Sequence, residues 1–315
     1  MVLNFVMVTI KDCGLMLEPQ EGMKVEDIVG FASYAERSGY GYIFRSDHLL
    51  PMSGTPKEND ASECWVTLGA IAARSEKIHF GPLVSPVGWR NPALLARMAC
   101  TLDSYSNGRF AFGFGAGWYE DEYKAHGFDF PSVKVRLGQL EEACAIIRTL
   151  TLGKKIDYEG AYFSAHVDCY PRPAKGHVHM IGGGRNPKVV QTLAKHVDEW
   201  NIFGSSVEKL RELKPYVERA KRELVISHMG SVLLADSPGE LQKRIDSFAK
   251  HRGVNADKLT PNALSMRGII TGTQSQFVSE LNSRVEAGIT KFYFQILSPE
   301  DKDGIRLLTD TLRTL

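Results

Sequence analysis

The sequence has 315 residues, of which 43% are hydrophobic and 24% charged, and its formal net charge is +1. This composition is typical of a globular protein, and the balanced, dispersed charge predicts neither nucleic acid nor an anionic membrane surface as a partner. No apolar run approaches the roughly 20 residues of a membrane-spanning helix, so we expect no membrane association. Five cysteines without a CxxC pair favour neither a zinc site nor a disulfide framework, and we expect a cytoplasmic protein.

Eight short apolar runs are spaced along the chain, and their composition is typical of strands buried on both faces. The expected strands, in chain order, are Leu3–Ile10, Tyr40–Arg45, Lys77–Val84, Arg109–Phe114, Val178–Ile181, Glu199–Phe203, Val225–Ala235 and Lys291–Leu297. The first run lacks the basic residues of a signal peptide, so we interpret it as a strand.

Helical patterns, many with recognisable start signals, separate most of these runs. Asn91-Pro92 and Asn186-Pro187 each place an N-cap before a proline at the first helical position. Three further pairs have the spacing of a capping box, and they are Ser205 with Glu208, Ser237 with Glu240, and Thr273 with Gln276. Helices are also expected at 25–38, from Ser62, at 136–150 and at 301–312.

Repeated strand–helix units predict a parallel sheet, and eight of them predict an α/β fold of the closed (β/α)8 TIM-barrel type. We expect one domain over residues 1–315, with insertions near 119–134, 153–176 and 252–272. The alternative is an open doubly wound sheet. It is less favoured because no GxGxxG sequence follows the first strand.

In a TIM barrel the functional site lies at the carboxyl ends of the strands. The second expected strand ends at Asp47 and His48. His48 is a candidate proton donor or acceptor at neutral pH, and Asp47 a candidate hydrogen-bond acceptor for a ligand. The alternative is that the pair only caps the next loop.

Three other strand ends carry candidate binding residues. Leu83, Val84 and Ser85 could support a planar ring, although Pro82 and Pro86 could also simply end that strand. Gly115 and Gly117 permit close approach of a ligand to the backbone, or form a tight turn. Trp118 could stack on a substrate or pack under the following loop. Gly182, Gly183, Gly184 and Arg185 precede a helix start, where backbone N–H groups and the helix dipole favour a phosphate.

Metal binding is not favoured. His166, His177 and His179 lie near Asp168 and Cys169 in the sequence, but their spacing matches no regular ligand pattern. We therefore expect no metal site.

Four segments together resemble the bacterial luciferase-like superfamily, and most closely its deazaflavin branch, which uses coenzyme F420. They are YIFRSDHL, GPLVSPVGWRNPALLARMACTLDSYSNGRFAFGFGAGW, RLGQLEEACAIIRTL and IGGGRNPKVVQTLAKHVDEWNI. The resemblance spans nearly the whole chain in the same order. It implies a TIM barrel with insertions, a flavin- or deazaflavin-dependent oxidoreductase and a homodimer.

The resemblance also implies roles for particular residues. Asp47 would contact the deazaflavin ring, and His48 would take part in proton transfer. Leu83-Val84 would form a non-prolyl cis peptide against the ring, and Gly182–Gly184 would bind the phosphate. Sugar-phosphate dehydrogenases of this branch carry a Trp and a Glu where this chain has Met52 and Trp118, so a sugar phosphate is not the favoured substrate.

The resulting hypothesis is an oxidoreductase that transfers a hydride between F420 and a small organic molecule, whose binding we expect to involve the loops 49–61, 119–134 and 252–272. One alternative is an FMN-dependent monooxygenase that receives reduced flavin from a partner reductase. Another is a non-catalytic flavin-binding protein.

Overall fold

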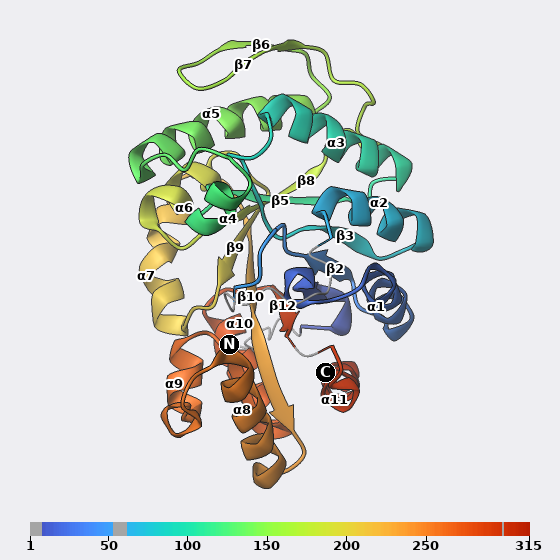
Figure 1. Ribbon diagram of the computed structural model, residues 1–315, viewed down its shortest axis with the longest axis vertical. Helices are drawn as coiled ribbons and strands as arrows, with labels where there is room; N and C mark the ends of the chain where they lie inside the picture. Colours follow the sequence, from blue (N-terminus) through green and yellow to red (C-terminus); the bar gives the residue numbers. More distant parts are fainter. Residues whose placement is uncertain (1–7, 53–61, 298) are drawn as a thin grey trace, which may run out of the picture.

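The computed structural model describes residues 8–52, 62–297 and 299–315, and it shows a barrel of eight parallel strands surrounded by helices (Figure 1). The barrel strands are β1 (Cys13–Leu17), β2 (Tyr42–Arg45), β3 (His79–Pro82), β5 (Ala111–Gly115), β8 (His179–Gly183), β9 (Glu199–Phe203), β10 (Val225–Ala235) and β12 (Lys291–Ile296). The predicted (β/α)8 TIM barrel is confirmed.

The barrel closes where the third strand meets the fourth. Hydrogen-bonded neighbours run in the order β3–β2–β1–β12–β10–β9–β8–β5–β4. Strand β4 (Ser85–Pro86) continues the course of β3 after a two-residue bulge and pairs with β5. Phe80 of β3 also pairs with Phe110, just before β5. The ends of the pairing order are therefore joined, and every barrel pairing is parallel.

The helices follow most of the predicted start signals. They are α1 (Val25–Ser38), α2 (Cys64–Arg74), α3 (Pro92–Tyr105), α4 (Glu120–Ala125), α5 (Val133–Thr151), α6 (Pro187–Ala194), α7 (Val207–Glu218), α8 (Pro238–Arg252), α9 (Pro261–Met266), α10 (Gln274–Glu286) and α11 (Lys302–Arg313), with 3-10 turns at Ile10–Asp12, Pro19–Glu21 and Ala256–Lys258. Asn91, Asn186 and Ser237 cap their helices as predicted. Within the described ranges, no helix combines the length and the apolar character that crossing a bilayer requires.

The first strand was predicted wrongly. Residues 3–7 of the expected strand lie outside the described residues, and Ile10 begins a 3-10 turn instead of continuing a strand. Asp12 stabilises this turn, because its carboxylate accepts hydrogen bonds from Thr9 N (3.0 Å) and Thr9 Oγ1 (2.8 Å). The true first strand is Cys13–Leu17, in which every residue is buried.

Two helix starts were also misplaced by one residue. Ser206, not Ser205, caps α7 by accepting a hydrogen bond from Lys209 N. Ser205 Oγ donates instead to Phe203 O, 2.9 Å away. Glu63, not Ser62, caps α2 through Val66 N. In each case two adjacent polar residues were candidates for the cap, and the second of them accepts the capping hydrogen bond.

Two of the expected insertions contain strands of their own. The 153–176 segment forms a hairpin of β6 (Ile156–Glu159) and β7 (Ser164–Val167), which lies beyond α3 and α5 at the top of Figure 1. The 252–272 segment contains β11 (Ile270–Thr273), a strand that the sequence analysis missed. It pairs with the extended end of β10, so that β10, β11, α8 and α9 form a lobe beside the barrel.

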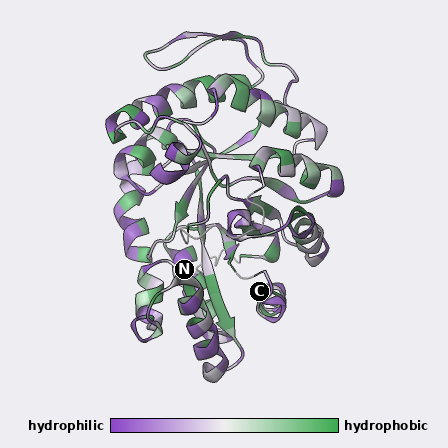
Figure 2. Cartoon of the chain, viewed as in Figure 1, coloured by the Kyte–Doolittle hydropathy of each residue, from purple (hydrophilic) through white to green (hydrophobic). Residues whose placement is uncertain are grey.

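Three apolar cores hold these parts together. The largest lies between the barrel and its helices. The barrel interior is filled by Met16, Phe44, Leu83, Ala111, Ile181, Met229 and Tyr293. The lobe has a core of its own, made of Ala235, Leu241, Ile245, Ala249, Leu259, Leu264 and Ile269. Figure 2 shows the corresponding pattern, with an apolar outer part of β10 and polar residues along the outer side of α8.

The amino-terminal end of the barrel is closed by a buried charge cluster. Glu199, the first residue of β9, is fully buried and accepts hydrogen bonds from Tyr293 Oη (2.7 Å) and Lys291 Nζ (2.9 Å). The His179 Nε2 atom lies 3.0 Å from the same carboxylate. This cluster lies at the opposite end from the predicted site, where charges in a TIM barrel serve stability.

Candidate functional site

The end of β2 carries a buried ion pair. Asp47 is 2% exposed, and its Oδ2 accepts hydrogen bonds from Ser85 Oγ (2.6 Å) and Arg90 Nη1 (2.7 Å). Arg90 also pairs with Glu63, and Trp65 Nε1 donates to Ser85 Oγ at 3.1 Å. Burial raises the pKa of Asp47, and the Arg90 charge and the Ser85 hydrogen bond oppose part of that rise. Asp47 and Ser85 follow different strands, and the hydrogen bond between them shows that the two strand ends meet at one place.

His48, the next residue, is held from the other side of the mouth by helix α4. Its Nδ1 atom lies 3.0 Å from both carboxylate oxygens of Glu122. The side chain of His48 remains 20% exposed, whereas that of Glu122 is 1% exposed. Burial by itself lowers the pKa of His48, but the hydrogen bond and charge of Glu122 outweigh it, so that the pKa is raised.

Two aromatic rings flank the imidazole. Trp118 and Tyr119 stack with a centroid separation of 5.2 Å, and both present edges to His48, at 5.8 Å and 6.1 Å. Trp118 is 62% exposed, an unusual exposure for an indole beside a buried ion pair. Trp118 is therefore placed to contact a molecule that reaches His48, and it does not pack under the following loop.

The Leu83-Val84 peptide bond is cis, as the resemblance implied. Leu83 points into the barrel core, and Val84 lies against the glycines of two neighbouring strands. A Cβ atom at Gly183 would lie 2.7 Å from Val84 Cγ1, and one at Gly115 would lie 3.2 Å from Val84 Cγ2. A larger residue at position 183 would displace Val84, and one at position 115 would be a tight fit against it.

Gly117 is constrained for a different reason. Its φ is +74°, and a Cβ atom there would lie 2.1 Å from Tyr123 Oη. Both the left-handed conformation and the close tyrosine exclude larger residues. The turn at Gly117 in turn directs Trp118 toward His48.

The Gly182–Arg185 segment leads directly into α6. The Gly184 N–H donates to Asn201 O at 3.3 Å, so this glycine N–H is not free for a ligand. Asn186 caps α6 by accepting from Lys188 N. The exposed Arg185 donates through Nη1 to Gly204 O at 3.3 Å. Binding of an anion at this position would therefore depend more on Arg185 and on the N–H groups at the start of α6 than on the N–H groups of the three glycines.

A buried chain of hydrogen bonds crosses the mouth from β2 to β10. Ser46 Oγ donates to Gln20 (2.6 Å), and Gln20 Nε2 donates to Glu18 (2.7 Å). From the other side, Ser231 Oγ donates to Gln295 (2.8 Å), whose amide donates to Glu18. All donors converge on the Glu18 carboxylate, which is 3% exposed.

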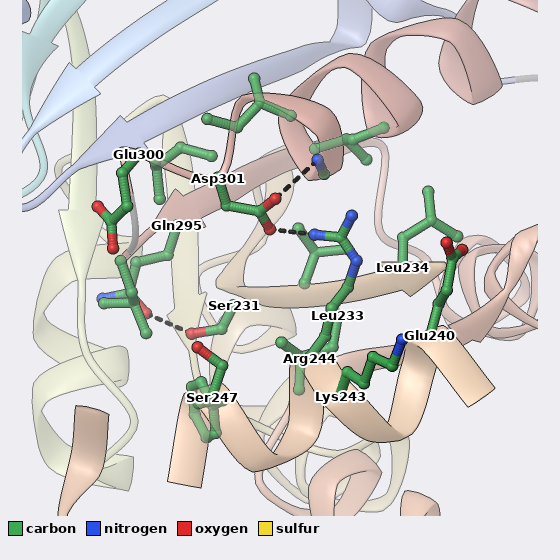
Figure 3. A pocket seen from close by; sticks show the side chains of 17 residues that line it. Ser231, Leu233, Leu234, Glu240, Lys243, Arg244, Ser247, Gln295, Glu300 and Asp301 are labelled. Carbon is green, nitrogen blue, oxygen red and sulfur yellow. Dashed lines mark hydrogen bonds and ion pairs between the residues drawn. The ribbon is translucent and has the colours of Figure 1, made fainter. Parts of the chain in front are cut away.

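This chain ends at a cavity of about 440 Å³ between the carboxyl ends of β10 and β12 (Figure 3). Ser231 and Gln295 form its wall on the barrel side, and α8 contributes Lys243 and Arg244. Arg244 is paired with Asp301 at the start of α11. The volume falls in the range of small-molecule sites. Its lining residues lie outside the loops 49–61, 119–134 and 252–272, where substrate contacts were expected.

The histidines considered for metal binding are spread over the molecule. His166 lies between Asp157 and Glu159 in the exposed hairpin, and His179 belongs to the Glu199 cluster. Among residues 8–52, 62–297 and 299–315, no group of three or more His, Cys, Asp or Glu is arranged to hold a metal ion. All five cysteines are buried and free.

The sequence analysis missed Arg90, Glu122 and Glu18. Arg90 stands one residue before the Asn91 N-cap, so its loop was predictable but its partner was not. Glu122 lies in a mixed segment without a clear pattern, 74 residues from His48. Glu18 could have been found, because it directly follows the true first strand and so lies at a strand end. It was missed because the first strand had been placed too early in the sequence.

Comparison with known proteins agrees with this architecture. The family model described as luciferase-like monooxygenase matches residues 3–291, so the chain belongs to this family. The resemblance inferred from the four sequence segments is thereby confirmed.

Relatives with assigned activities include F420-dependent enzymes. The F420-dependent glucose-6-phosphate dehydrogenase of Beutenbergia cavernae is 33% identical over 149 residues, which are 47% of this chain and 44% of that protein, so the match spans less than half of the relative's length. The enzyme of the same description from Intrasporangium calvum is 31% identical over 292 residues, covering 83% of this chain and 86% of that protein.

Solved structures share the fold at lower identity. A coenzyme F420-dependent tetrahydromethanopterin reductase from Methanopyrus kandleri has a TM-score of 0.78 at 18% identity, with 96% of this chain and 98% of that chain covered. An F420-dependent secondary alcohol dehydrogenase, solved with an F420–acetone adduct, has a TM-score of 0.80 at 20% identity, with 97% and 98% covered.

Proposed function

We propose that this chain is an F420-dependent oxidoreductase that transfers a hydride between the deazaflavin and a small alcohol or carbonyl compound. The observation that carries the proposal is the arrangement of Val84 and the glycine strand ends on one side of the barrel mouth, with His48 on another. F420 dependence in the named relatives supports the choice of cofactor.

The residues present fit a flat ring with an anionic tail. The cis peptide at Leu83-Val84 and the side-chain-free ends of β5 and β8 form a wall that a planar ring can lie against. The phosphate would be bound by the positive charge of Arg185 and by the positive end of the helix dipole at the start of α6. Asp47 would face the ring edge, and Ser85 and Arg90 fix the orientation of its carboxylate.

When bound, the deazaflavin supplies the hydride-accepting carbon. The protein binds and orients both partners, and His48 takes the hydroxyl proton of an alcohol substrate and returns it in the reverse direction. Trp118 covers the reacting end of the substrate.

Binding experiments test the cofactor assignment. Titration of the purified protein with F420 and with FMN, followed by fluorescence, is expected to show tight binding of F420 only. Tight FMN binding without F420 binding would overturn the proposal and favour an FMN-dependent monooxygenase. Binding of F420 by a protein that neither oxidises any of a panel of alcohols nor reduces any of a panel of ketones would favour a non-catalytic flavin-binding protein.

We further propose that the protein is a homodimer. Val66 of α2 and Leu94 of α3 are 74% and 51% exposed and belong to two neighbouring helices, where a second copy of the chain would cover them. Light scattering is expected to give twice the mass of the 35.0 kDa chain. Replacement of both residues by Asp should shift the protein to the monomer mass.

A cytoplasmic location is part of the same proposal. The support is the state of the cysteines, which are all free and buried, as is usual in a reducing compartment. Fractionation of cells that express the natural protein tests it directly.

A further inference from the structure

Glu122 makes more contacts to the His48 segment than a simple ion pair needs. One of its oxygens, Oε1, accepts hydrogen bonds from the backbone N–H groups of Leu49 (2.8 Å) and Leu50 (3.1 Å). Both of its oxygens lie 3.0 Å from His48 Nδ1. One buried carboxylate on α4 therefore fixes the backbone after β2 and the imidazole at the same time.

These contacts dictate where the imidazole carries its proton. An ionised carboxylate can only accept hydrogen bonds, so Nδ1 must be the protonated nitrogen of the ring. The other nitrogen, Nε2, has no hydrogen-bond partner among the described residues. Because the side chain is 20% exposed, Nε2 is the atom that an incoming molecule can reach.

We propose that Glu122 is a positioning residue that keeps the His48 proton on Nδ1 and so reserves Nε2 as the acceptor of the substrate's hydroxyl proton. This inference rests on the proposed function and adds to it a residue that acts through His48. In alcohol oxidation the C–H bond breaks and its electron pair leaves with the hydrogen to the oxidised deazaflavin. The O–H bond breaks toward Nε2, and the substrate carbon–oxygen bond becomes a carbonyl.

The groups that face His48 stabilise the imidazolium that forms when Nε2 accepts a proton. Glu122 faces the ring from α4, Glu18 follows the end of β1, and Asp47 precedes His48 after the end of β2, and all three carboxylates favour the protonated imidazole. Tyr119 is the neighbouring titratable ring. Once Nε2 has accepted a proton, the positive charge of the imidazolium is therefore balanced at Nδ1.

A glutamine at position 122 should reverse the tautomer. The N–H groups of Leu49 and Leu50 can be satisfied only by the amide oxygen, which places the amide NH₂ opposite His48 Nδ1. The amide oxygen also lies beside Nδ1, but its two lone pairs are taken by these two N–H groups. Nδ1 is therefore expected to accept from the NH₂, so that the ring proton moves to Nε2 and the base is lost. Glu122→Gln thus keeps the shape of the side chain and changes only the direction of one hydrogen bond.

Nitrogen NMR of histidine-labelled protein without cofactor reads the tautomer directly. Among the signals of the nine histidines, those of His48 are identified by their absence from the spectrum of a His48→Gln variant. In the wild type at a pH where the ring is neutral, we expect the proton on Nδ1 of His48, and in Glu122→Gln on Nε2. A wild-type spectrum with the proton on Nε2 overturns the inference, even if the variant fails to fold.

Kinetics provides the second readout. With F420 and an alcohol that the wild type oxidises, Glu122→Gln should lower kcat by about 100-fold or more, the range expected for loss of a general base, with little change in KM. Glu122→Asp should recover part of the activity. The matched control is Glu120→Gln on the same helix, whose partner is Lys124, and it should change neither tautomer nor kcat.

The outcomes separate this inference from the proposed function. If F420 does not bind, the proposed function fails while the tautomer measurement stands. If F420 binds and Glu122→Gln leaves kcat and its pH profile unchanged, the positioning role is wrong and the cofactor assignment stands.

Discussion

At the scale of single residues, the candidate site contains buried charged groups whose hydrogen-bond and ion-pair partners replace water. Asp47 is the clearest example, since its side chain is fully buried and Arg90 is its cation. A carboxylate in this position is tolerated only while the guanidinium and the Ser85 hydroxyl replace the water it has lost.

Removal of Arg90 should therefore be costly. We expect Arg90→Met to lower the free energy of unfolding by about 3–5 kcal/mol at pH 7, because it leaves an uncompensated buried charge. The folded-state pKa of Asp47 then rises further above its unfolded value, so the loss is greatest at high pH and fades as the pH falls through the raised folded-state pKa of Asp47, before the unfolded value near 4 is reached. Urea unfolding at several pH values measures both effects.

Arg37→Met, at an exposed position on α1, serves as the control, and it should change stability by less than about 0.5 kcal/mol. An Arg90→Met loss that is equally large at pH 4 and pH 8 would show that lost packing, and not the Asp47 charge, is responsible.

Candidate site residues could be proposed from the sequence where they followed the end of a strand. Asp47, His48 and Trp118 were proposed in this way, because the carboxyl ends of barrel strands converge. Their partners were not, since the approach of Glu122 to His48 depends on how the 119–134 segment folds across the mouth. No local pattern encodes a contact between residues so far apart in the chain.

At the scale of elements, the wall beside the proposed ring is a packing arrangement between three strand ends. Val84 can cover the ends of β5 and β8 only because both end in glycines. The same glycines were predicted as points of close ligand approach. The structure shows that a valine of this chain, Val84, lies against both of them.

Gly183→Ala tests this packing. Its Cβ would lie 2.7 Å from Val84 Cγ1, and we expect a loss of about 1–3 kcal/mol in stability together with weaker F420 binding. Adding Val84→Ala should restore part of the stability, because the clash disappears. Thermal or urea unfolding and F420 titration provide the two measurements.

The contrast is Gly30→Ala in α1, where the added Cβ meets no atom within 4 Å. This change should stabilise the protein by about 0.5–1 kcal/mol through helix propensity. If Gly183→Ala caused no loss of stability, as expected for Gly30→Ala, the close packing of Val84 against Gly183 would be wrong.

At the scale of the whole molecule, the sequence pattern was sufficient for the barrel because seven of its eight strands were placed close to their true positions. The first strand was missed, since CGLML contains a cysteine and a glycine and follows a more apolar run. The lobe was missed because β11 is short and becomes a strand only by pairing with the extension of β10. Local composition carries no information on such a pairing.

The barrel is also held together by charge at the end remote from the site. Burial would raise the pKa of Glu199, but hydrogen bonding by His179 and the charge of Lys291 lower it to about 2. Since the unfolded value is near 4.3, the cluster contributes on the order of 3 kcal/mol above that pH, and this contribution is lost as the pH falls toward 2.

Glu199→Gln should therefore destabilise the protein at pH 7 and matter progressively less in acid. The difference in unfolding free energy between the wild type and the variant should shrink by about half between pH 5 and pH 3, as measured by urea unfolding. Glu76→Gln, at an exposed position, should follow the wild type throughout. A pH-independent difference would mean that Glu199 acts through its hydrogen bonds, which glutamine cannot fully replace, and not through its charge. Because the cluster joins β8, β9 and β12 at the amino-terminal end, F420 affinity at neutral pH should remain close to that of the wild type in the folded variant.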